Sequence, residues 1–323
     1  MILGQDRAVE QFAGAWQRRT LHHAWLLAGP KGVGKARFAR EAATRVLAEA
    51  AGPPIAAGGI ETPVDHPTAK LIAAGSHPDL RWLERLENDN TGNLARNIKV
   101  DQVRELGGFL NLTPALSPWR AVVIDSVDDL EKSAANALLK MLEEPPPNTL
   151  FFLVSHAPGR LLPTIRSRCR RLDFQSLGSD VMASIVASEA PAVPAAERDR
   201  IVAAAGGSAG RALALAQLDL VSLEASALRI LREGDPTNAR RSELALELAK
   251  RGAADRYAAF LELAPSLIAG EARRLSGPSR VRALDAYAKS RELAAVAPRL
   301  SLDPAATILQ LGGIFAEVAN PVP

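Results

Sequence analysis

The chain has 323 residues, of which 47% are hydrophobic and 23% charged, so it can form two or three domains with packed cores. Its 39 basic and 36 acidic side chains leave a formal charge of +3, which is too small to indicate a nucleic-acid partner by itself. The single cysteine, Cys169, excludes an internal disulfide and a zinc site built from several thiolates.

Neither a secretory signal nor a membrane span is expected. Residues 1–6 contain no basic stretch followed by a long apolar run, and no window of the sequence holds about 18 consecutive apolar residues. We therefore expect a soluble, cytoplasmic chain without membrane contact.

In the first half of the chain, short apolar runs alternate with helical segments. Buried strands are predicted at residues 24–28, 121–124 and 150–154. Helices are predicted at residues 6–18, 35–50 and 133–143, and the Pro-, Gly- and Ala-rich stretch 51–67 predicts a loop. Buried strands separated by helices indicate an α/β domain with a parallel sheet that is covered on both faces.

After about Phe174 the sequence shows no clear strand. Residues 206–210, Gly-Gly-Ser-Ala-Gly, predict a turn between helices. From Val221 onward we expect four or five Ala- and Leu-rich helices, with breaks near residues 234–236, 277–278 and 303–304. The second half of the chain is therefore expected to be all-α.

Residues 29–36, Gly-Pro-Lys-Gly-Val-Gly-Lys-Ala, match seven of the eight positions of the P-loop template G-x-x-x-x-G-K-[ST]. The glycines allow successive peptide N–H groups to converge on a phosphate, and the lysine can reach the β- and γ-phosphates. The preceding strand and the following helix favour a P-loop over a chance glycine turn. The residues expected to contact nucleotide are Gly29, Gly32, Val33, Gly34, Lys35 and Ala36.

Two substitutions weaken the expected ATP site. Ala36 stands where the template has Ser or Thr, whose hydroxyl would ligate Mg²⁺. Asp125, at the end of the second predicted strand, is placed near that metal, but Ser126 follows it where ATPases of the AAA+ class commonly have a Glu. Asp128 and Asp129 are expected to act as acids at the start of a helix. We therefore expect that the chain does not hydrolyse ATP itself.

Four segments together resemble the AAA+ clamp-loader family of bacterial DNA polymerase III. They are residues 22–35, 133–146, 161–169 with its Ser-Arg-Cys motif, and 207–213. The resemblance extends over about residues 1–215, and within the family the altered ATP site points to the delta-prime type of subunit. It implies an AAA+ P-loop α/β domain at 1–173, a helical lid at 174–220 and an all-α collar domain at 221–323.

The resemblance also implies roles for single residues. Arg168 would be an arginine finger that reaches the γ-phosphate bound by a neighbouring subunit. Ser155 would be sensor 1, Arg211 sensor 2, and residues 2–5 the adenine-pocket segment. Alternatively, Arg168 belongs to a solvated basic face, and the two sensors are structural remnants. The other basic residues of that face are Arg160, Arg166, Arg170 and Arg171. Of these, Arg166, Arg170 and Arg171 are expected to be surface charges or contacts to DNA phosphates.

Members of the family often carry a four-cysteine zinc module, and the corresponding stretch here, roughly residues 51–80, has no cysteine. His66 and His77 remain there, but two histidines without thiolates make a poor zinc site, so we expect no metal. Cys169 is expected to be a small core residue rather than a reactive thiol. ATP or ADP is expected to bind weakly, if it binds.

The implied partners are the motor ATPase and delta subunits of a hetero-pentamer, a sliding clamp and primed DNA. Two other functions remain open from the sequence. One is an active AAA+ motor subunit of a clamp loader or a related replication or repair ATPase, against which Ala36 and Ser126 argue. The other is a module that only binds nucleic acid, which the P-loop and the small net charge disfavour.

Overall fold

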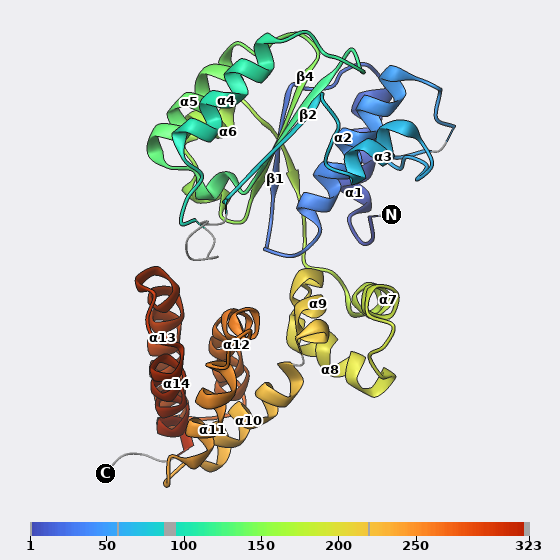
Figure 1. Ribbon diagram of the computed structural model, residues 1–323. Coiled ribbons are helices and arrows are strands. Elements are labelled where there is room, and N and C mark those ends of the chain that lie inside the picture. Colours follow the sequence, from blue (N-terminus) through green and yellow to red (C-terminus); the bar gives the residue numbers. More distant parts are fainter. Residues whose placement is uncertain (1, 57, 87–94, 219, 320–323) are drawn as a thin grey trace. The chain divides into compact units, whose positions relative to one another are not determined.

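The computed structural model describes residues 2–56, 58–86, 95–218 and 220–319. These residues form two compact units, shown in Figure 1. The sheet unit comprises the described part of Met1–Met182 together with Gly206–Gly210, and the helical unit comprises that of Ala183–Ala205 and Arg211–Pro323. This division does not test the predicted domain boundaries at 173/174 and 220/221, which stay predictions.

Within the described residues, the sheet unit contains a five-stranded parallel sheet in the order β2-β3-β4-β1-β5. The strands are β1 (Ala24–Ala28), β2 (Leu80–Glu84), β3 (Arg120–Asp125), β4 (Thr149–Ser155) and β5 (Arg170–Asp173). The register pairs Ala28 of β1 with Ser155 of β4, and Asp125 of β3 with Val154 of β4. The carboxyl ends of β1, β3 and β4 therefore meet at one edge of the sheet, where the loops that follow them lie together.

Helices cover both faces of this sheet (Figure 1). They are α1 (Asp6–Gln17), α2 (Lys35–Ala51), α3 (Pro67–Ala73), α4 (Val100–Asn111), α5 (Lys132–Glu143) and α6 (Pro163–Ser167). Because side chains alternate along a strand, Phe152 packs with Phe12 and Phe38 on the α1–α2 side, while Phe151 packs with Leu138 on the α4–α5 side. The expected parallel sheet with two covered faces is confirmed.

Strands β2 and β5 and helix α4 were not predicted from the sequence. The strand β5 reads Arg-Arg-Leu-Asp, and only Leu172 of it is buried. In β2 only Leu83 is fully buried, Leu80 and Trp82 are half-buried, and Arg81 and Glu84 are exposed. Both strands lie at the edges of the sheet, where one neighbouring strand supplies the pairing and the apolar signal of a central strand is missing.

The helical unit begins within α7 (Ser179–Glu189). The following helices are α8 (Ala195–Ala205), α9 (Ala209–Gln217), α10 (Leu220–Glu233), α11 (Ala239–Leu248), α12 (Ala254–Ala272), α13 (Gly277–Leu300) and α14 (Pro304–Ala319). The described residues after β5 form no strand, which confirms the expected all-α C-terminal region. Over the described ranges, no helix has both the length and the apolar character needed to cross a membrane.

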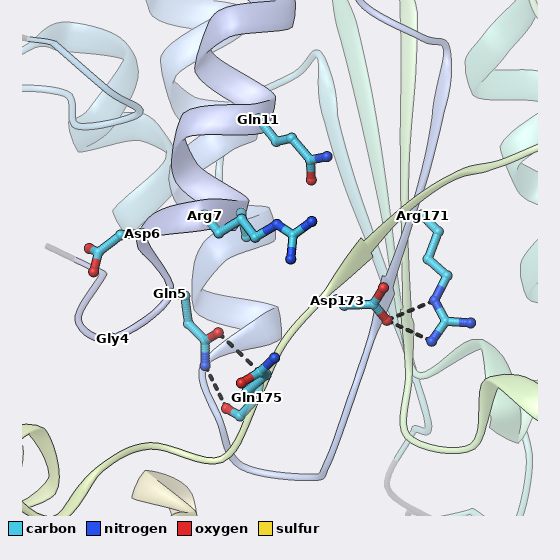
Figure 2. A pocket seen from close by; sticks show the side chains of 9 residues that line it. Gly4, Gln5, Asp6, Arg7, Gln11, Arg171, Asp173 and Gln175 are labelled. Atoms are coloured by element: carbon cyan, nitrogen blue, oxygen red, sulfur yellow. Dashed lines mark hydrogen bonds and ion pairs between the residues drawn. The ribbon is translucent and has the colours of Figure 1, made fainter.

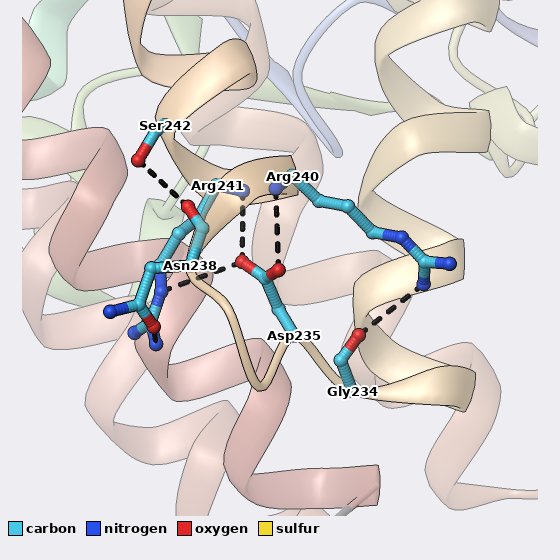
Figure 3. A network of polar contacts seen from close by, with 6 residues as sticks. All are labelled: Gly234, Asp235, Asn238, Arg240, Arg241 and Ser242. Carbon is cyan, nitrogen blue, oxygen red and sulfur yellow. Dashed lines mark hydrogen bonds and ion pairs between the residues drawn. The ribbon is translucent and has the colours of Figure 1, made fainter.

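A buried carboxylate fixes the corner between α10 and α11 (Figure 3). Asp235 is 4% exposed, and its carboxylate accepts hydrogen bonds from the peptide N–H groups of Arg240 and Arg241 at 3.2 and 3.0 Å. These two N–H groups lie in the first turn of α11, where they have no partner within the helix. Asn238 occupies the N-cap position of α11 without a side-chain hydrogen bond to the first turn, and Asp235 supplies that capping contact from three residues earlier.

Replacing Asp235 by alanine is expected to lower the free energy of unfolding by about 1–3 kcal/mol, because buried N–H groups at the start of α11 lose their acceptor. Urea unfolding followed by circular dichroism measures the change. Asp235→Asn keeps one acceptor oxygen and should lose less. Asp285→Ala, at an exposed position of α13, is the control and should stay within about 0.5 kcal/mol of the original chain. Equal effects of Asp235→Ala and Asp285→Ala would contradict the capping role.

Candidate functional site

The loop between β1 and α2 has the tight backbone that the P-loop motif predicts. Gly32 has a φ of +78°, a left-handed conformation that favours glycine. A Cβ at Gly32 would lie 2.2 Å from Ser208 Oγ, and a Cβ at Gly29 would lie 2.2 Å from the carbonyl oxygen of Phe174. The loop is therefore shaped by its contacts with segments that lie far away in the sequence.

One of these segments is the turn Gly206–Gly210. Ser208 Oγ donates a hydrogen bond to the carbonyl oxygen of Lys31 at 3.0 Å, and the N–H of Gly210 donates to the carbonyl oxygen of Gly32 at 2.9 Å. These contacts engage carbonyl oxygens of the loop, not the peptide N–H groups that would face a phosphate. The turn thus braces the loop from its outer side.

Lys35 lies at the start of α2 and is 3% exposed. Its Nζ donates hydrogen bonds to the carbonyl oxygens of Gly29, at 2.7 Å, and of Pro30. Burial lowers the pKa of Lys35 to about 8, although the carboxylates of Asp125 and Asp128 oppose the shift. Lys35 therefore remains mostly protonated at neutral pH and can offer a positive charge to a phosphate.

The stability of the chain should rise between pH 8 and pH 10.5 because of Lys35. The folded chain loses the Lys35 proton near pH 8, whereas the unfolded chain keeps it up to about 10.5, so the unfolded state binds more protons within this window. Raising the pH from 7 to 10 should stabilise the original chain by about 2 kcal/mol relative to Lys35→Met, as measured by urea unfolding. Parallel pH dependence of the two proteins would contradict the lowered pKa.

At the ends of β3 and β4, polar side chains bind one another. Ser155 is fully buried, and its Oγ donates a hydrogen bond to Asp128 Oδ1 at 2.8 Å. The N–H of His156 donates to the other carboxylate oxygen of Asp128. Asp128 lies in the first turn of the short 3-10 helix Val127–Asp129, as expected of an acid at a helix start, and its carboxylate also holds the end of β4. Sequence reasoning missed this link between Asp128 and Ser155.

Asp125 and Ser126 lie where the sequence places them, directly after the buried part of β3. Burial raises the pKa of Asp125, the charge of Glu84 adds to the shift, and Lys35 opposes it. Ser126 is 3% exposed, and its Oγ lies 3.4 Å from a carboxylate oxygen of Asp129. A buried hydroxyl that binds a neighbouring carboxylate cannot act as a base toward water at neutral pH.

Arg211 belongs to α9 in the helical unit. There its guanidinium donates a hydrogen bond to Ser266 Oγ. Burial lowers the pKa of Arg211, and the charges of Glu224 and Glu262 oppose that shift. The sensor-2 role stays a prediction.

Arg168 is the C-cap residue that directly follows α6. Its Nη1 donates a hydrogen bond to the carbonyl oxygen of Thr164 at 2.9 Å, and its Nη2 lies 2.6 Å from Glu143 Oε1. The side chain is 33% exposed, so its guanidinium reaches the surface of the sheet unit. Burial raises the pKa of the adjacent Cys169 thiol to about 12, which agrees with a packing role and excludes a reactive thiolate at neutral pH.

The neighbouring arginines have partners within the sheet unit. The guanidinium of Arg170 lies 5.1 Å from the ring centroid of Trp25, and Arg171 forms an ion pair of 2.6 Å with Asp173. Arg168 also has partners within the sheet unit, so it differs from these two arginines in its position directly after α6 and not in being unpaired.

A pocket of about 350 Å³ lies beside the start of α1 and the edge strand β5 (Figure 2). It is lined by Gly4, Gln5, Asp6, Arg7, Ala8, Gln11, Arg171, Asp173 and Gln175. The amide of Gln5 donates to the carbonyl oxygens of Gln175 and Val33 at 2.8 and 3.3 Å, so it joins the N-terminal segment to the P-loop. The sequence pointed to residues 2–5 as the adenine-pocket segment, and that role stays a prediction.

The two histidines of the stretch 51–80 serve local turns. His66 Nδ1 accepts a hydrogen bond from the N–H of Thr68, and His77 Nδ1 accepts one from the N–H of Asp79, each at 3.2 Å. Among the described residues, no group of three or more His, Cys, Asp or Glu side chains is arranged to hold a metal ion.

Residues 4–178 match the protein family described as "DNA polymerase III, delta subunit". DNA polymerase III subunit delta' of Pseudomonas aeruginosa is 39% identical over 186 residues, which cover 58% of this chain and 53% of that protein. Subunit tau of Bacillus subtilis is 31% identical over 223 residues, which cover 66% of this chain and 36% of that protein. The chain thus spans about half the length of the first relative and about a third of the second.

Among solved structures, a DNA polymerase III gamma subunit-related protein from Thermotoga maritima has a TM-score of 0.46 and 19% identity. The alignment covers 96% of this chain and 100% of that one.

Proposed function

Because the chain belongs to the DNA polymerase III delta-subunit family, we propose that it acts as the delta-prime-type subunit of a clamp loader. In this role it hydrolyses little or no ATP and supplies Arg168 in trans to the ATP site of a neighbouring motor subunit. The sliding clamp is then loaded onto primed DNA during replication.

The observation that carries this proposal is the position of Arg168. An arginine has five N–H donors in a planar fork, and the contacts with Thr164 and Glu143 engage only its two Nη atoms. Each Nη carries two hydrogens, so N–H groups remain for the oxygens of a phosphate. An arginine side chain that directly follows α6, is held by two contacts and is one-third exposed suits contact with a ligand held by another subunit.

Two features support the absence of hydrolysis by the chain itself. Ala36 offers no hydroxyl to Mg²⁺, and Ser126 is buried against acidic side chains where a water-positioning Glu would be needed. The intact loop and Lys35 would still allow ATP or ADP to bind weakly. No zinc is part of the proposal.

The proposed partners are the motor ATPase and delta subunits of a hetero-pentamer, which this chain would join through its all-α C-terminal region as a collar. The sliding clamp and primed DNA are the proposed substrates of the assembly, and the proposed location is the cytoplasm. The test is reconstitution: adding the chain to motor and delta subunits should yield one complex by gel filtration and raise ATP turnover with clamp and primed DNA. No co-elution and no increase in turnover would contradict the proposal.

A second candidate is an active motor subunit of a clamp loader or a related ATPase. The observation in its favour is the braced P-loop with Lys35 in place, together with the similarity to a tau subunit. Steady-state ATP turnover by the isolated chain separates the two candidates, since only a motor hydrolyses ATP through its own loop.

A further inference from the structure

An ion pair between Glu143 and Arg168 joins the C-terminal ends of α5 and α6. Glu143 is the last residue of α5, and Arg168 follows the last residue of α6. Their side chains meet at 2.6 Å between Glu143 Oε1 and Arg168 Nη2. On its other terminal nitrogen, Arg168 binds the carbonyl oxygen of Thr164 at 2.9 Å.

These two contacts hold the guanidinium at both terminal nitrogens. Because the guanidinium is planar, fixing Nη1 and Nη2 also fixes the direction in which its remaining N–H groups point. The Glu143 side chain is 47% exposed and that of Arg168 33%, so the pair is screened by solvent and adds little to stability. Its consequence is therefore the orientation of Arg168 rather than the stability of the fold.

We propose that Glu143 is a positioning residue for Arg168. Glu143 holds the Arg168 guanidinium in the orientation that binds the γ-phosphate of an ATP on the neighbouring subunit. The inference rests on the proposed function of Arg168. In this proposal Glu143 acts only through Arg168, with which it forms the ion pair. It acts by limiting the rotamers of a long side chain before the neighbour's nucleotide arrives.

The test uses a reconstituted complex in which the only intact ATP site is the one beside this chain. Glu143→Ala should lower the turnover number by about tenfold, because a misplaced arginine stabilises the transition state less well. Glu143→Gln should lower it less, since the amide oxygen can still accept an Arg168 N–H. Glu144→Ala is the matched control, because Glu144 is the next carboxylate along the chain, is exposed, and lies outside this ion pair. It should leave turnover unchanged.

A double-mutant cycle distinguishes positioning from a general structural effect. In an Arg168→Ala background, Glu143→Ala should cause no further loss, because no finger remains to be oriented. The urea midpoint of the isolated Glu143→Ala chain should equal that of the original chain.

The following outcomes would overturn the inference. If Arg168→Ala lowers turnover but Glu143→Ala does not, or raises it, Glu143 does not position the finger, and the proposed function survives. If Glu143→Ala lowers turnover equally with and without Arg168, Glu143 acts by another route. If Arg168→Ala itself has no effect, the proposed function fails and this inference fails with it.

Discussion

Replacing Arg168 by alanine is expected to reduce ATP turnover at the adjacent motor site by on the order of 10³-fold, which is the lower end of what an arginine finger contributes in other nucleotide hydrolases. The guanidinium neutralises charge that develops on the γ-phosphate, and a methyl group cannot replace it. The measurement is steady-state ATP hydrolysis by the reconstituted complex with clamp and primed DNA. Clamp loading onto that DNA should slow in parallel.

The Arg168→Ala chain should fold and assemble normally. The side chain is 33% exposed, and its ion-pair partner Glu143 becomes more solvated when the arginine is removed. Gel filtration should therefore show an unchanged complex. Arg168→Lys should restore little activity, because an ammonium group is a point charge that lacks the planar fork.

Arg171→Ala is the control for the alternative that this region is only a basic surface. Arg171 is 55% exposed and paired with Asp173, so its loss should weaken DNA affinity slightly, in a way that added salt largely removes. If the Arg168→Ala complex assembles and hydrolyses ATP as fast as the original complex, Arg168 belongs to such a surface. That result would contradict the proposed mechanism.

The isolated chain is expected to hydrolyse ATP no faster than ATP is hydrolysed in the buffer alone. Ala36 has no hydroxyl group to ligate Mg²⁺. Ser126 is buried beside Asp129, in the place of a Glu that would position water. Losing one catalytic contribution of this kind costs about 10²–10³-fold in rate, and two such losses leave almost nothing to measure. The measurement is phosphate release by highly purified chain with Mg²⁺ and ATP.

Lys35→Ala is the control for contaminating ATPases. A trace of activity that persists in Lys35→Ala comes from a contaminant. Ala36→Thr together with Ser126→Glu tests the converse, since it supplies both missing groups and should restore some turnover. Robust hydrolysis by the original chain that Lys35→Ala abolishes would show that the site is active, and would favour the motor subunit.

Features that depend only on neighbouring residues could be predicted from the amino-acid sequence of this protein. The apolar run 24–28 predicts a buried strand, and β1 is buried along its whole length. The helices predicted at 35–50 and 133–143 form within one residue of their predicted ends. The glycine spacing of the P-loop and the substitution at Ala36 are visible in eight consecutive letters. Such features need no knowledge of the topology, since backbone sterics and the local apolar pattern specify them.

Contacts between segments that lie far apart in the sequence follow from the packing of the fold. The edge strand β5 has one buried residue, and its pairing with β1 makes it a strand. Asp128 binds Ser155 across 27 positions, and Glu143 binds Arg168 across 25, because parallel strands and their crossover helices bring these ends together. The partner of a carboxylate cannot be identified from the sequence, since the carboxylate can bind any positive charge or hydrogen-bond donor that the fold brings near it. The positions of the expected site were therefore readable from the sequence, while the contacts that orient its side chains were set by the packing of the sheet and helices.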